Sequence, residues 1–231
     1  QLMIINLFKL LRQAFFKSLD KIFFSQFGED RIINEIFNSN IKNGFYVDVG
    51  CYHPIKHSNT FRLNKKGWSG INIDIEKDKI KVFNLIRKKD LNVLVPVSSK
   101  NELLTVYKTQ NYGVGSTTKK EFIEDSSKIL KTESLFSQTL TQIINNSSYK
   151  DRQIDLLSID TEGTDFDVLK SLNFEQYRPK VIIVESQLND INKILKSDIY
   201  NFLLKKNYYL RSWAFYSLIF ILPNSKSVRN R

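Results

Sequence analysis

The sequence predicts an α/β fold, with helices on both faces of a mostly parallel β-sheet. Strand-like and helix-like segments alternate along most of the chain, which is typical of parallel strands joined by crossover helices. Two β-rich runs close the chain with too few residues between them for a crossover helix, so they must pair antiparallel. The chain has 231 residues, of which 42% are hydrophobic, and this is enough for one sizeable core.

The expected elements follow one another in a regular order. Five short apolar runs are the expected parallel strands, at residues 45–49, 69–75, 91–98, 155–160 and 180–185. Helical segments are expected at residues 57–66, 77–88, 134–145, 165–172 and 190–206. The terminal hairpin, expected at residues 208–216 and 217–223, brings the sheet to seven strands. Residues 99–132 lack a clear pattern, and an irregular insertion of this length in an α/β domain is often a substrate loop.

Residues 2–24 are expected to form an amphipathic helix, so that residues 1–24 precede a domain of residues 25–231. The apolar side chains of this segment fall on one helical face, and its Lys and Arg side chains fall on the other. Such a helix binds a membrane surface or a partner, or else packs on the core of its own domain. No stretch of 18 apolar residues and no small-residue cleavage site are present, so neither a transmembrane helix nor a signal peptide is expected.

The net charge of +11 indicates a basic surface, which suits nucleic acid, anionic lipid or an acidic glycan. Frequent Lys, Asn and Ile residues also fit biased codon usage, which explains the charge without any partner. No motif of an RNA-binding module is visible, so no nucleic-acid partner is expected. The single cysteine, Cys51, excludes an internal disulfide and fits a reducing compartment. We therefore expect a cytoplasmic protein, held at the membrane surface if the N-terminal helix binds lipid.

Acidic residues stand at the ends of four of the five expected parallel strands. They are Asp48 in the first strand, Asp74 and Glu76 at the second, Asp160 and Glu162 at the fourth, and Glu185 at the fifth. The carboxyl ends of parallel strands meet at one edge of the sheet, where α/β proteins bind their ligands. One acid at a strand end is commonplace, but four at one edge indicate a site.

The spacing of Gly50 and Asp74 indicates an adenosine cofactor. Asp74 comes 24 residues after Gly50, at the end of the second strand, where a carboxylate accepts hydrogen bonds from ribose hydroxyls. The three-glycine pyrophosphate fingerprint and the phosphate-binding GxxxxGK[ST] motif are both missing from the sequence. An adenosine cofactor without a pyrophosphate favours S-adenosylmethionine, whose positive sulfonium and amino groups suit an acidic site.

The chain resembles the FkbM family of class I methyltransferases that depend on S-adenosylmethionine. The resemblance covers about residues 25–186 and rests on "SQFGED" (25–30), "FYVDVG" (45–50), "SNTF" (58–61), "KKGWSGINID" (65–74), "LLSIDTEGTDFDVLKSL" (156–172) and "PKVIIVES" (179–186). It implies a Rossmann-like methyltransferase fold and methyl transfer to oxygen, often to a sugar hydroxyl of a glycan. The residues expected to bind the cofactor are Asp48, Gly50, Cys51, Tyr52, Asp74, Ile75, Ser98 and Asp160.

Two positions depart from the family pattern. Many relatives follow the first glycine with Ala, whereas this chain has the small Cys51, and then Tyr52, His53 and Pro54 in the loop that would face the methionine half of the cofactor. Asp74 stands where relatives usually have Glu. Its shorter side chain can still accept hydrogen bonds from the ribose hydroxyls.

A general base is expected, because a sugar hydroxyl is a poor nucleophile. The catalytic candidates are Asp160, which we prefer, followed by Glu162 and His53, with His57 as a further candidate. Glu162 is equally explained as a carboxylate at a helix N-terminus, and each His as an ordinary polar loop residue.

Other functions remain open at this stage. Asp160, Glu162 and Glu185 could bind Mg²⁺ in a metal-dependent O-methyltransferase, although we expect no metal. The charge alone suggests an RNA methyltransferase, and a non-catalytic protein that binds the cofactor or a glycan is a further alternative. Lys119 and Lys120, in the irregular insertion, could meet acidic groups of a saccharide acceptor.

Overall fold

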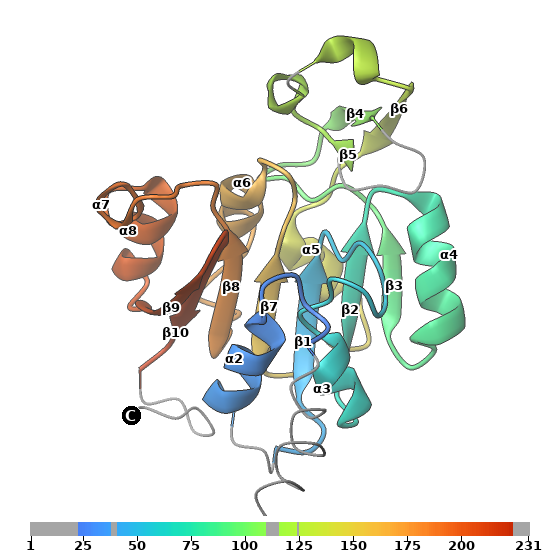
Figure 1. Ribbon diagram of the computed structural model, residues 1–231. Coiled ribbons are helices and arrows are strands. Elements are labelled where there is room, and N and C mark those ends of the chain that lie inside the picture. Colours follow the sequence, from blue (N-terminus) through green and yellow to red (C-terminus); the bar gives the residue numbers. More distant parts are fainter. Residues whose placement is uncertain (1–22, 38–40, 110–115, 124, 224–231) are drawn as a thin grey trace, which may run out of the picture.

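A computed structural model describes residues 23–37, 41–109, 116–123 and 125–223. Within these residues, the main β-sheet has seven strands in the order β3-β2-β1-β7-β8-β10-β9 (Figure 1). Their bounds are β1 Phe45–Val49, β2 Ser69–Asp74, β3 Leu91–Leu94, β7 Leu156–Ile159, β8 Val181–Glu185, β9 Tyr209–Ala214 and β10 Ser217–Ile221. Strand β10 runs antiparallel to both β8 and β9, and the other neighbours in the sheet are parallel. The predicted Rossmann-like, mostly parallel sheet with a terminal hairpin is confirmed.

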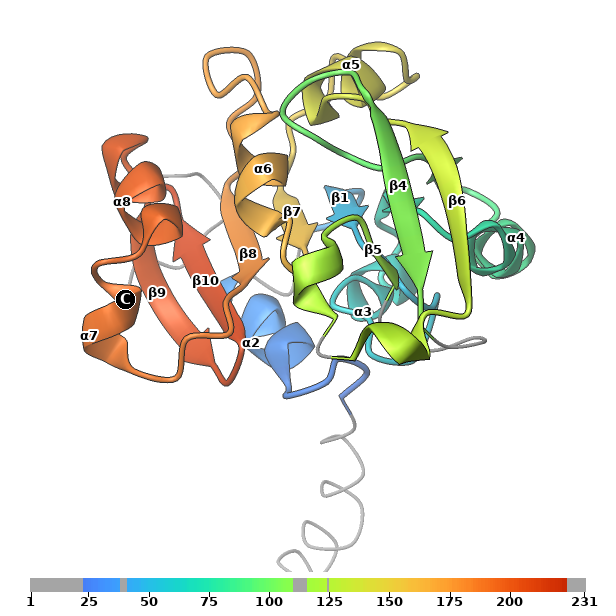
Figure 2. The ribbon, with the colours of Figure 1, turned by 90° about the horizontal axis from the view of Figure 1, so that it is seen from above.

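Helices cover both faces of this sheet, as expected. Helices α2 (Glu29–Ile36) and α3 (Phe61–Lys65) lie on one face, and α5 (Leu140–Asn145), α6 (Asp165–Lys170) and α8 (Asp198–Lys205) lie on the other (Figure 2). Helix α4 (Lys77–Ile86) packs against β2 and β3. The short helix α7 (Ile191–Ile194) precedes α8. Strands β1, β2, β7, β8 and β10 are therefore buried on both sides, whereas β3 and β9, at the two edges of the sheet, are partly exposed.

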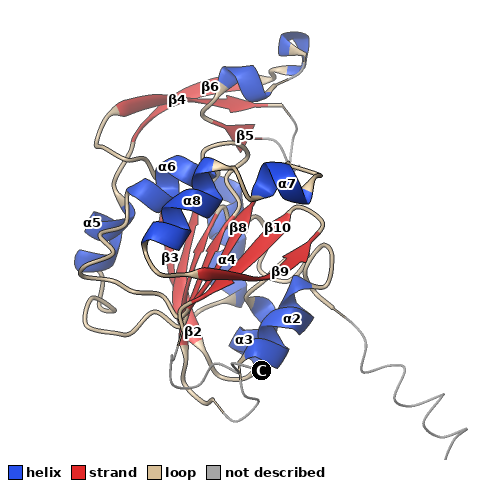
Figure 3. Cartoon of the chain, turned by 90° about the vertical axis from the view of Figure 1, so that its left-hand side faces the viewer, coloured by secondary structure: helices blue, strands red, loops and turns tan. Residues whose placement is uncertain are grey.

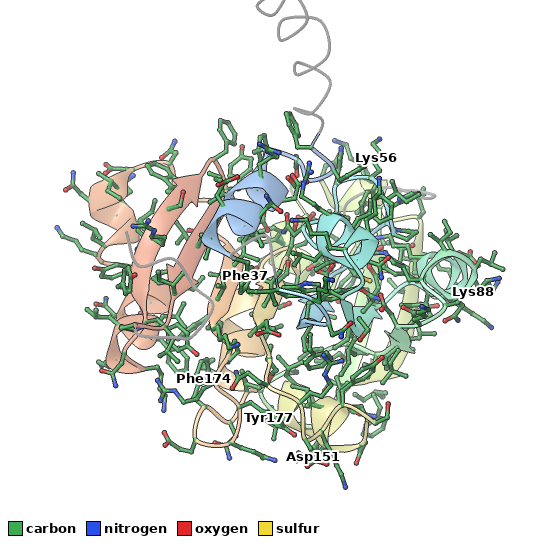
Figure 4. All side chains as sticks on the ribbon, turned by 90° about the horizontal axis from the view of Figure 1, so that it is seen from below. Phe37, Lys56, Lys88, Asp151, Phe174 and Tyr177 are labelled. Carbon is green, nitrogen blue, oxygen red and sulfur yellow. The ribbon has the colours of Figure 1, made fainter. Side chains whose placement is uncertain are left out.

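The alternation of side chains along β1 divides the core between the two faces. Phe45, Val47 and Val49 belong to the larger apolar cluster, which includes Phe174 and Tyr177. Neighbouring strand positions belong to a second cluster under α2, in which the ring of Phe37 meets Trp68 edge to face at 5.0 Å. Figure 4, seen from below, shows Phe37 beside α2, and Phe174 and Tyr177 toward the opposite side. Burial on both faces explains why these strands read as continuous apolar runs.

A second, three-stranded sheet caps the carboxyl edge of the main sheet (Figures 1 and 3). Strand β4 (Leu103–Lys108) pairs antiparallel with β5 (Ser116–Thr117) and with β6 (Lys131–Phe136), and the short helices η2 (Lys120–Phe122) and η3 (Ser126–Lys128) complete this cap. The expectation that residues 99–132 are irregular was therefore wrong in part, because they contain strands β4 and β5 and the start of β6. The sequence KTESLF is polar and half exposed, so its strand is set by pairing with β4 and leaves no periodic signal.

Several expected elements have different bounds, and cap residues explain two of these corrections. The helix expected at 134–145 begins at Leu140, because Thr139 caps it and exchanges side-chain hydrogen bonds with Gln142. The helix expected at 190–206 is divided into α7 and α8, because Ser197 starts a second helix by accepting the backbone N–H of Tyr200. The helix expected at 57–66 and the strand expected at 91–98 are shorter, spanning α3 and β3.

The N-terminal helix expected at residues 2–24 lies almost wholly outside the described residues. None of the helices in the described part of the chain has both the length and the apolar character that a membrane span requires.

The carboxyl ends of β1 and β7 approach each other closely at Gly50. This residue has a φ of 75°, and a Cβ atom built on it would lie 1.7 Å from the backbone oxygen of Asp160. Its N–H donates to the Ile73 carbonyl of β2 at 2.9 Å. Glycine is required here because no side chain fits between the two strand ends.

We predict that Gly50→Ala destabilises the fold strongly. The left-handed backbone costs roughly 1–2 kcal/mol in a residue with a Cβ, and the clash with a backbone oxygen adds about 1–3 kcal/mol. Gly67→Ala is the matched control, since Gly67 has a φ of 88° but no atom within 4 Å of its added Cβ. Urea denaturation should show a loss of stability for Gly50→Ala at least twice that for Gly67→Ala. Equal losses would contradict the close approach.

Candidate functional site

A cavity of about 1190 Å³, including the space open to solvent at its mouth, lies at the carboxyl edge of the main sheet. Its walls come from the ends of β1, β2, β7 and β8, from the turn before α2, and from the cap. Of the residues predicted to form the site, the cavity is lined by Asp48, Gly50, Cys51, Tyr52, Asp74, Ile75, Asp160, Glu162, Glu185 and His57. This is the edge at which α/β folds bind ligands.

Two predicted residues stand apart from the cavity. Ser98 is buried, and its hydroxyl lies 3.4 Å from a carboxylate oxygen of Glu102, while Val95, Pro96 and Val97 line the wall instead. The Nδ1 atom of His53 accepts the backbone N–H groups of Ile55 and Lys56, at 3.1 and 2.9 Å, so this ring orders its own loop.

The loop after β1 is held by Asp74. One carboxylate oxygen accepts the backbone N–H of Tyr52 at 3.0 Å, and the other accepts that of Glu76 at 2.9 Å. Lys79 approaches Asp74 at 3.9 Å and pairs with Glu76 at 2.9 Å. Each carboxylate oxygen has a second lone pair, so Asp74 keeps the capacity to accept two further hydrogen bonds from a ligand.

The buried guanidinium of Arg87 supports residues 54–60, which belong to the loop after β1. Arg87 is 1% exposed and donates to the carbonyl of Pro54 through both Nε and Nη2, at 2.9 and 2.7 Å. It also donates to the hydroxyl groups of Ser58 and Tyr46, at 3.0 and 2.8 Å. Its negative partner, Asp90, lies at 3.8 Å and accepts the Tyr46 hydroxyl. This network fixes residues 54–60 against the sheet.

Asp48 lies between this network and the cavity floor. Its carboxylate accepts the hydroxyl of Thr60 at 2.7 Å. Burial raises the pKa of Asp48, and the hydrogen bond from Thr60 and the charge of Arg87 oppose that rise. Asp48 is therefore held by hydrogen bonding to Thr60, and it forms part of the floor of the cavity.

Asp160 and Glu185 form an acid pair at the ends of β7 and β8. The two strands are parallel, and Ile159 pairs with Val184, so the next residues of both strands lie side by side. Both residues line the cavity, and solvent reaches Asp160 through it. Two carboxylates at adjacent strand ends repel each other, so a proton on one of them is favoured.

The electrostatic surroundings keep that proton bound near neutral pH. Desolvation raises the pKa of Asp160, and the charges of Glu185, Asp165 and Glu162 raise it further. Desolvation also raises the pKa of Glu185 to about 7, with additional contributions from Asp165 and Glu162. Glu185 thus titrates near the pH at which a general base works best, and Asp160 beside it keeps its proton to a higher pH than an ordinary Asp does.

Glu162 lies in the loop that follows the acid pair and has an unusual backbone. Its φ is 51°, in the left-handed region, and its carbonyl accepts the hydroxyl of Thr117 from the cap at 2.9 Å. Desolvation raises the pKa of its carboxyl group. The neighbouring Asp165 accepts the N–H groups of Thr161 and Gly163, at 2.8 and 3.2 Å, and so closes the start of α6.

The cap makes further contacts with the residues around the site. Ser116 donates to Glu76 at 2.8 Å, after β2, and Phe122 lies against Gly163, where an added Cβ would be 2.4 Å from the ring. Lys119, which we considered for acidic sugar groups, pairs with Asp167 at 3.4 Å.

Several residues that line the cavity were missed by the reasoning from sequence. Phe27 and Glu29 belong to the SQFGED motif and Asn59 to the SNTF motif, and both motifs were noted without a role for these residues. Tyr216 and Ser217, in the terminal hairpin, carried no signal in the sequence. Among the described residues, no group of three or more His, Cys, Asp or Glu side chains is placed to hold a metal ion.

The comparisons with known proteins agree with this geometry. The family model of the methyltransferase FkbM domain matches residues 48–210. The fold is similar to the crystal structure of methyltransferase FkbM from Methylobacillus flagellatus KT, with a TM-score of 0.50 and 11% identity over 80% of this chain and 45% of that chain. The chain thus spans less than half of that protein.

A second solved structure has a weaker similarity. It is a TehB-like SAM-dependent methyltransferase from Corynebacterium glutamicum ATCC 13032 Kitasato, with a TM-score of 0.41 and 10% identity over 85% of this chain and 88% of that one. No curated protein matches the chain.

The acid pair predicts a dependence of stability on pH. The pKa of Glu185 is about 7 in the folded state and 4.5 as an ordinary Glu, so the folded state binds more protons between these values. The stabilisation is complete below about pH 4.5 and is lost as the pH rises through about 7. Glu185→Gln should therefore flatten the fall in unfolding free energy between pH 5 and 8 by about 1–2 kcal/mol. Urea denaturation across this range measures it, and an unchanged slope in the variant would count against the acid pair.

Proposed function

The chain belongs to the FkbM methyltransferase family, and on that basis we propose that it transfers a methyl group from S-adenosylmethionine to a hydroxyl of a saccharide. One observation carries the proposal. The acid pair, which holds a proton near neutral pH, lies at the same cavity as the loop that Asp74 orders, and the two are joined by the contact of Gly50 with Asp160.

The residues of the cavity fit S-adenosylmethionine. Asp74 keeps free lone pairs for two ribose hydroxyls, and the side chains of Ile75, Val95 and Pro96 supply an apolar wall for the adenine. At Gly50 the backbone lies open to the cavity without a side chain. When bound, this cofactor supplies the electrophilic methyl group and attracts carboxylates through its positive charge.

The acid pair suits the removal of a proton from the acceptor. The bound cofactor would supply the methyl group to the acceptor oxygen, and the protein would have to take up the proton that the hydroxyl loses. The hydroxyl proton passes to the acid pair, which carries one proton and has room for a second. Asp160 is the group nearer to the acceptor on this proposal, since it is exposed within the cavity, and Glu185 tunes it. Because the pKa of Glu185 is about 7, the pair has a suitable proton affinity at neutral pH.

A saccharide acceptor is supported by the groups around the acid pair. Glu29 and Ser217 are hydrogen-bonded to each other at 3.0 Å and line the same side of the cavity, where they offer further oxygen atoms to sugar hydroxyls. The FkbM resemblance points to the same substrate class. The positions of His53 and Glu162 make them weaker candidates for the base, because His53 does not line the cavity and Glu162 lies in the loop held by the cap.

We predict that Asp74→Asn weakens the binding of S-adenosylmethionine at least tenfold. The substitution keeps the shape but removes the charge and one acceptor oxygen, and hydrogen bonds to a charged group contribute about 1.5–3 kcal/mol each. Isothermal titration calorimetry measures the affinity, and circular dichroism checks the fold. Asp78→Asn, on the exposed side of α4, is the matched control and should bind as the wild type does. Unchanged affinity in Asp74→Asn would remove Asp74 from the cofactor site.

We predict that Asp160→Asn lowers the rate of methyl transfer by about 10²–10⁴, the usual contribution of a general base. The affinity for S-adenosylmethionine should change by less than threefold. The assay follows labelled methyl transfer to a panel of neutral and acidic glycans over pH 5–9. Glu185→Gln should shift the pH profile instead of abolishing activity, since Glu185 acts through Asp160. A rate within threefold of the wild type in Asp160→Asn would move the role to His57 or Glu162.

A further inference from the structure

Three aromatic rings gather at one side of the cavity mouth, and none of them has a role in the chemistry described so far. This aromatic cluster consists of Phe27, Phe215 and Tyr216, and Phe27 and Tyr216 line the cavity. The rings of Phe27 and Phe215 stack at 4.6 Å, and Tyr216 meets Phe215 edge to face at 4.7 Å and Phe27 at 5.7 Å. In Figure 2 the turn between β9 and β10 lies beside the chain that leads into α2.

The aromatic cluster is exposed but firmly placed. Its rings are 38%, 61% and 39% exposed for Phe27, Phe215 and Tyr216, although large aromatic side chains are usually buried. The carbonyl of Tyr216 accepts the N–H of Ser186 at 2.7 Å, and Ser217 donates to Glu29. These bonds hold the backbone of Tyr216 and the side chain of Ser217 in place, and the three rings pack on one another.

The cluster stands directly beside the acid pair. Ser217, the residue after Tyr216, pairs with Glu185 across β10 and β8. Tyr216 therefore precedes the residue that lies opposite Glu185 in the sheet, and Glu185 is the neighbour of Asp160. A ligand that reaches the acid pair from this side of the cavity lies against the aromatic cluster.

The turn itself carries an unfavourable choice of residue. Phe215 has a φ of 55°, in the left-handed region that hairpin turns normally fill with Gly, Asn or Asp. An exposed Phe at such a position gains little from burial and is strained in its backbone. The presence of an exposed Phe in a strained backbone beside the cavity is more easily explained by contact with a ligand than by a gain in folding stability.

The charges around the cluster restrict what the ligand can be. The carboxyl groups of Glu29, Asp160 and Glu185 line this side of the cavity. Of the described residues that line the cavity, Lys79 and His57 are the basic ones, and Lys79 is paired with Glu76. An anionic group near the cluster would face carboxylates without a compensating cation.

We propose that the aromatic cluster is a stacking platform for a neutral hexopyranoside, which it holds with one hydroxyl directed at the acid pair. This inference rests on the proposed function and narrows its substrate class. A pyranose ring presents C–H groups on its face and hydroxyls at its edge. The rings cover the C–H face, and the carboxyl groups accept the hydroxyls, so both sides of the sugar are matched by the side chains present.

The test uses Phe215→Gly in the full chain. This substitution removes the most exposed ring and also relieves the left-handed backbone, so the hairpin is expected to keep its fold. Tyr216→Ala is a second variant, and Phe136→Ala is the matched control, since Phe136 is 68% exposed on the cap and does not line the cavity. The probes are the methyl glycosides of glucose, galactose, mannose and N-acetylglucosamine, together with methyl glucuronide as the charged counterpart of the glucoside.

Saturation-transfer NMR measures contact with each probe, and labelled S-adenosylmethionine measures transfer. We expect at least one neutral glycoside to receive saturation at its ring C–H groups and glucuronide to receive at least fivefold less. Phe215→Gly should abolish this contact and raise the acceptor KM at least tenfold, with kcat within threefold. Affinity for S-adenosylmethionine should be unchanged, and Phe136→Ala should behave as the wild type.

The outcomes separate the platform from the proposed function. If a glycoside is methylated with the same KM in Phe215→Gly, the function stands and the platform is wrong. If Phe215→Gly loses glycoside contact but no saccharide is methylated, the platform stands and the proposed reaction is wrong. No contact with any neutral glycoside, or tighter binding of glucuronide, overturns the platform. Dimerisation on size-exclusion that is lost in Phe215→Gly, with unchanged KM, would assign the cluster to self-association instead.

Discussion

The contact between Gly50 and the backbone of Asp160 is the constraint on which the site depends. It brings the ends of β1 and β7 closer than any residue with a Cβ would allow. On one side of the contact, the loop after β1 turns toward Asp74. On the other side, Asp160 stands beside Glu185 because β7 and β8 are parallel and in register. The proposed cofactor loop and the acid pair therefore share one rigid junction, and their relative position is set by backbone atoms rather than by flexible side chains.

The region under the β1 loop is unusually polar for a protein core. Arg87, Asp90, Tyr46 and Asn72 are buried there, and their hydrogen bonds reach Pro54, Ser58 and Thr60. Such a network contributes less to stability than an apolar core of the same volume, because both charges lose their hydration. The network does fix the orientation of the residues that it contacts, because each hydrogen bond allows a narrow range of geometry. The loop that faces the cavity is thus positioned by a buried guanidinium, and Asp48 is held in place by the same neighbours.

Carboxyl groups dominate the cavity although the chain carries a net charge of +11. Desolvation raises the pKa values of Asp160 and Glu185, and the charges of neighbouring acids raise them further, which is why the acid pair keeps a proton near neutral pH. The same field favours a cationic cofactor and disfavours an anionic acceptor. The basic charge of the whole chain therefore says little about this site, because the local arrangement of acids decides which ligands are favoured.

The sequence by itself determined the parallel sheet, the terminal hairpin and the edge at which the acids gather, because apolar periodicity and strand-end positions are local features. It also identified Gly50, Asp74 and Asp160, which stand next to strands with a clear pattern. Only the tertiary structure decided the rest. The cap depends on pairing between β4 and β6, whose polar residues carry no periodicity of their own. The side-by-side position of Asp160 and Glu185 depends on strand register, and the bond between Ser217 and Glu29 joins residues 188 positions apart. Contacts at such separations are set by how the whole chain packs, and a local pattern does not record them.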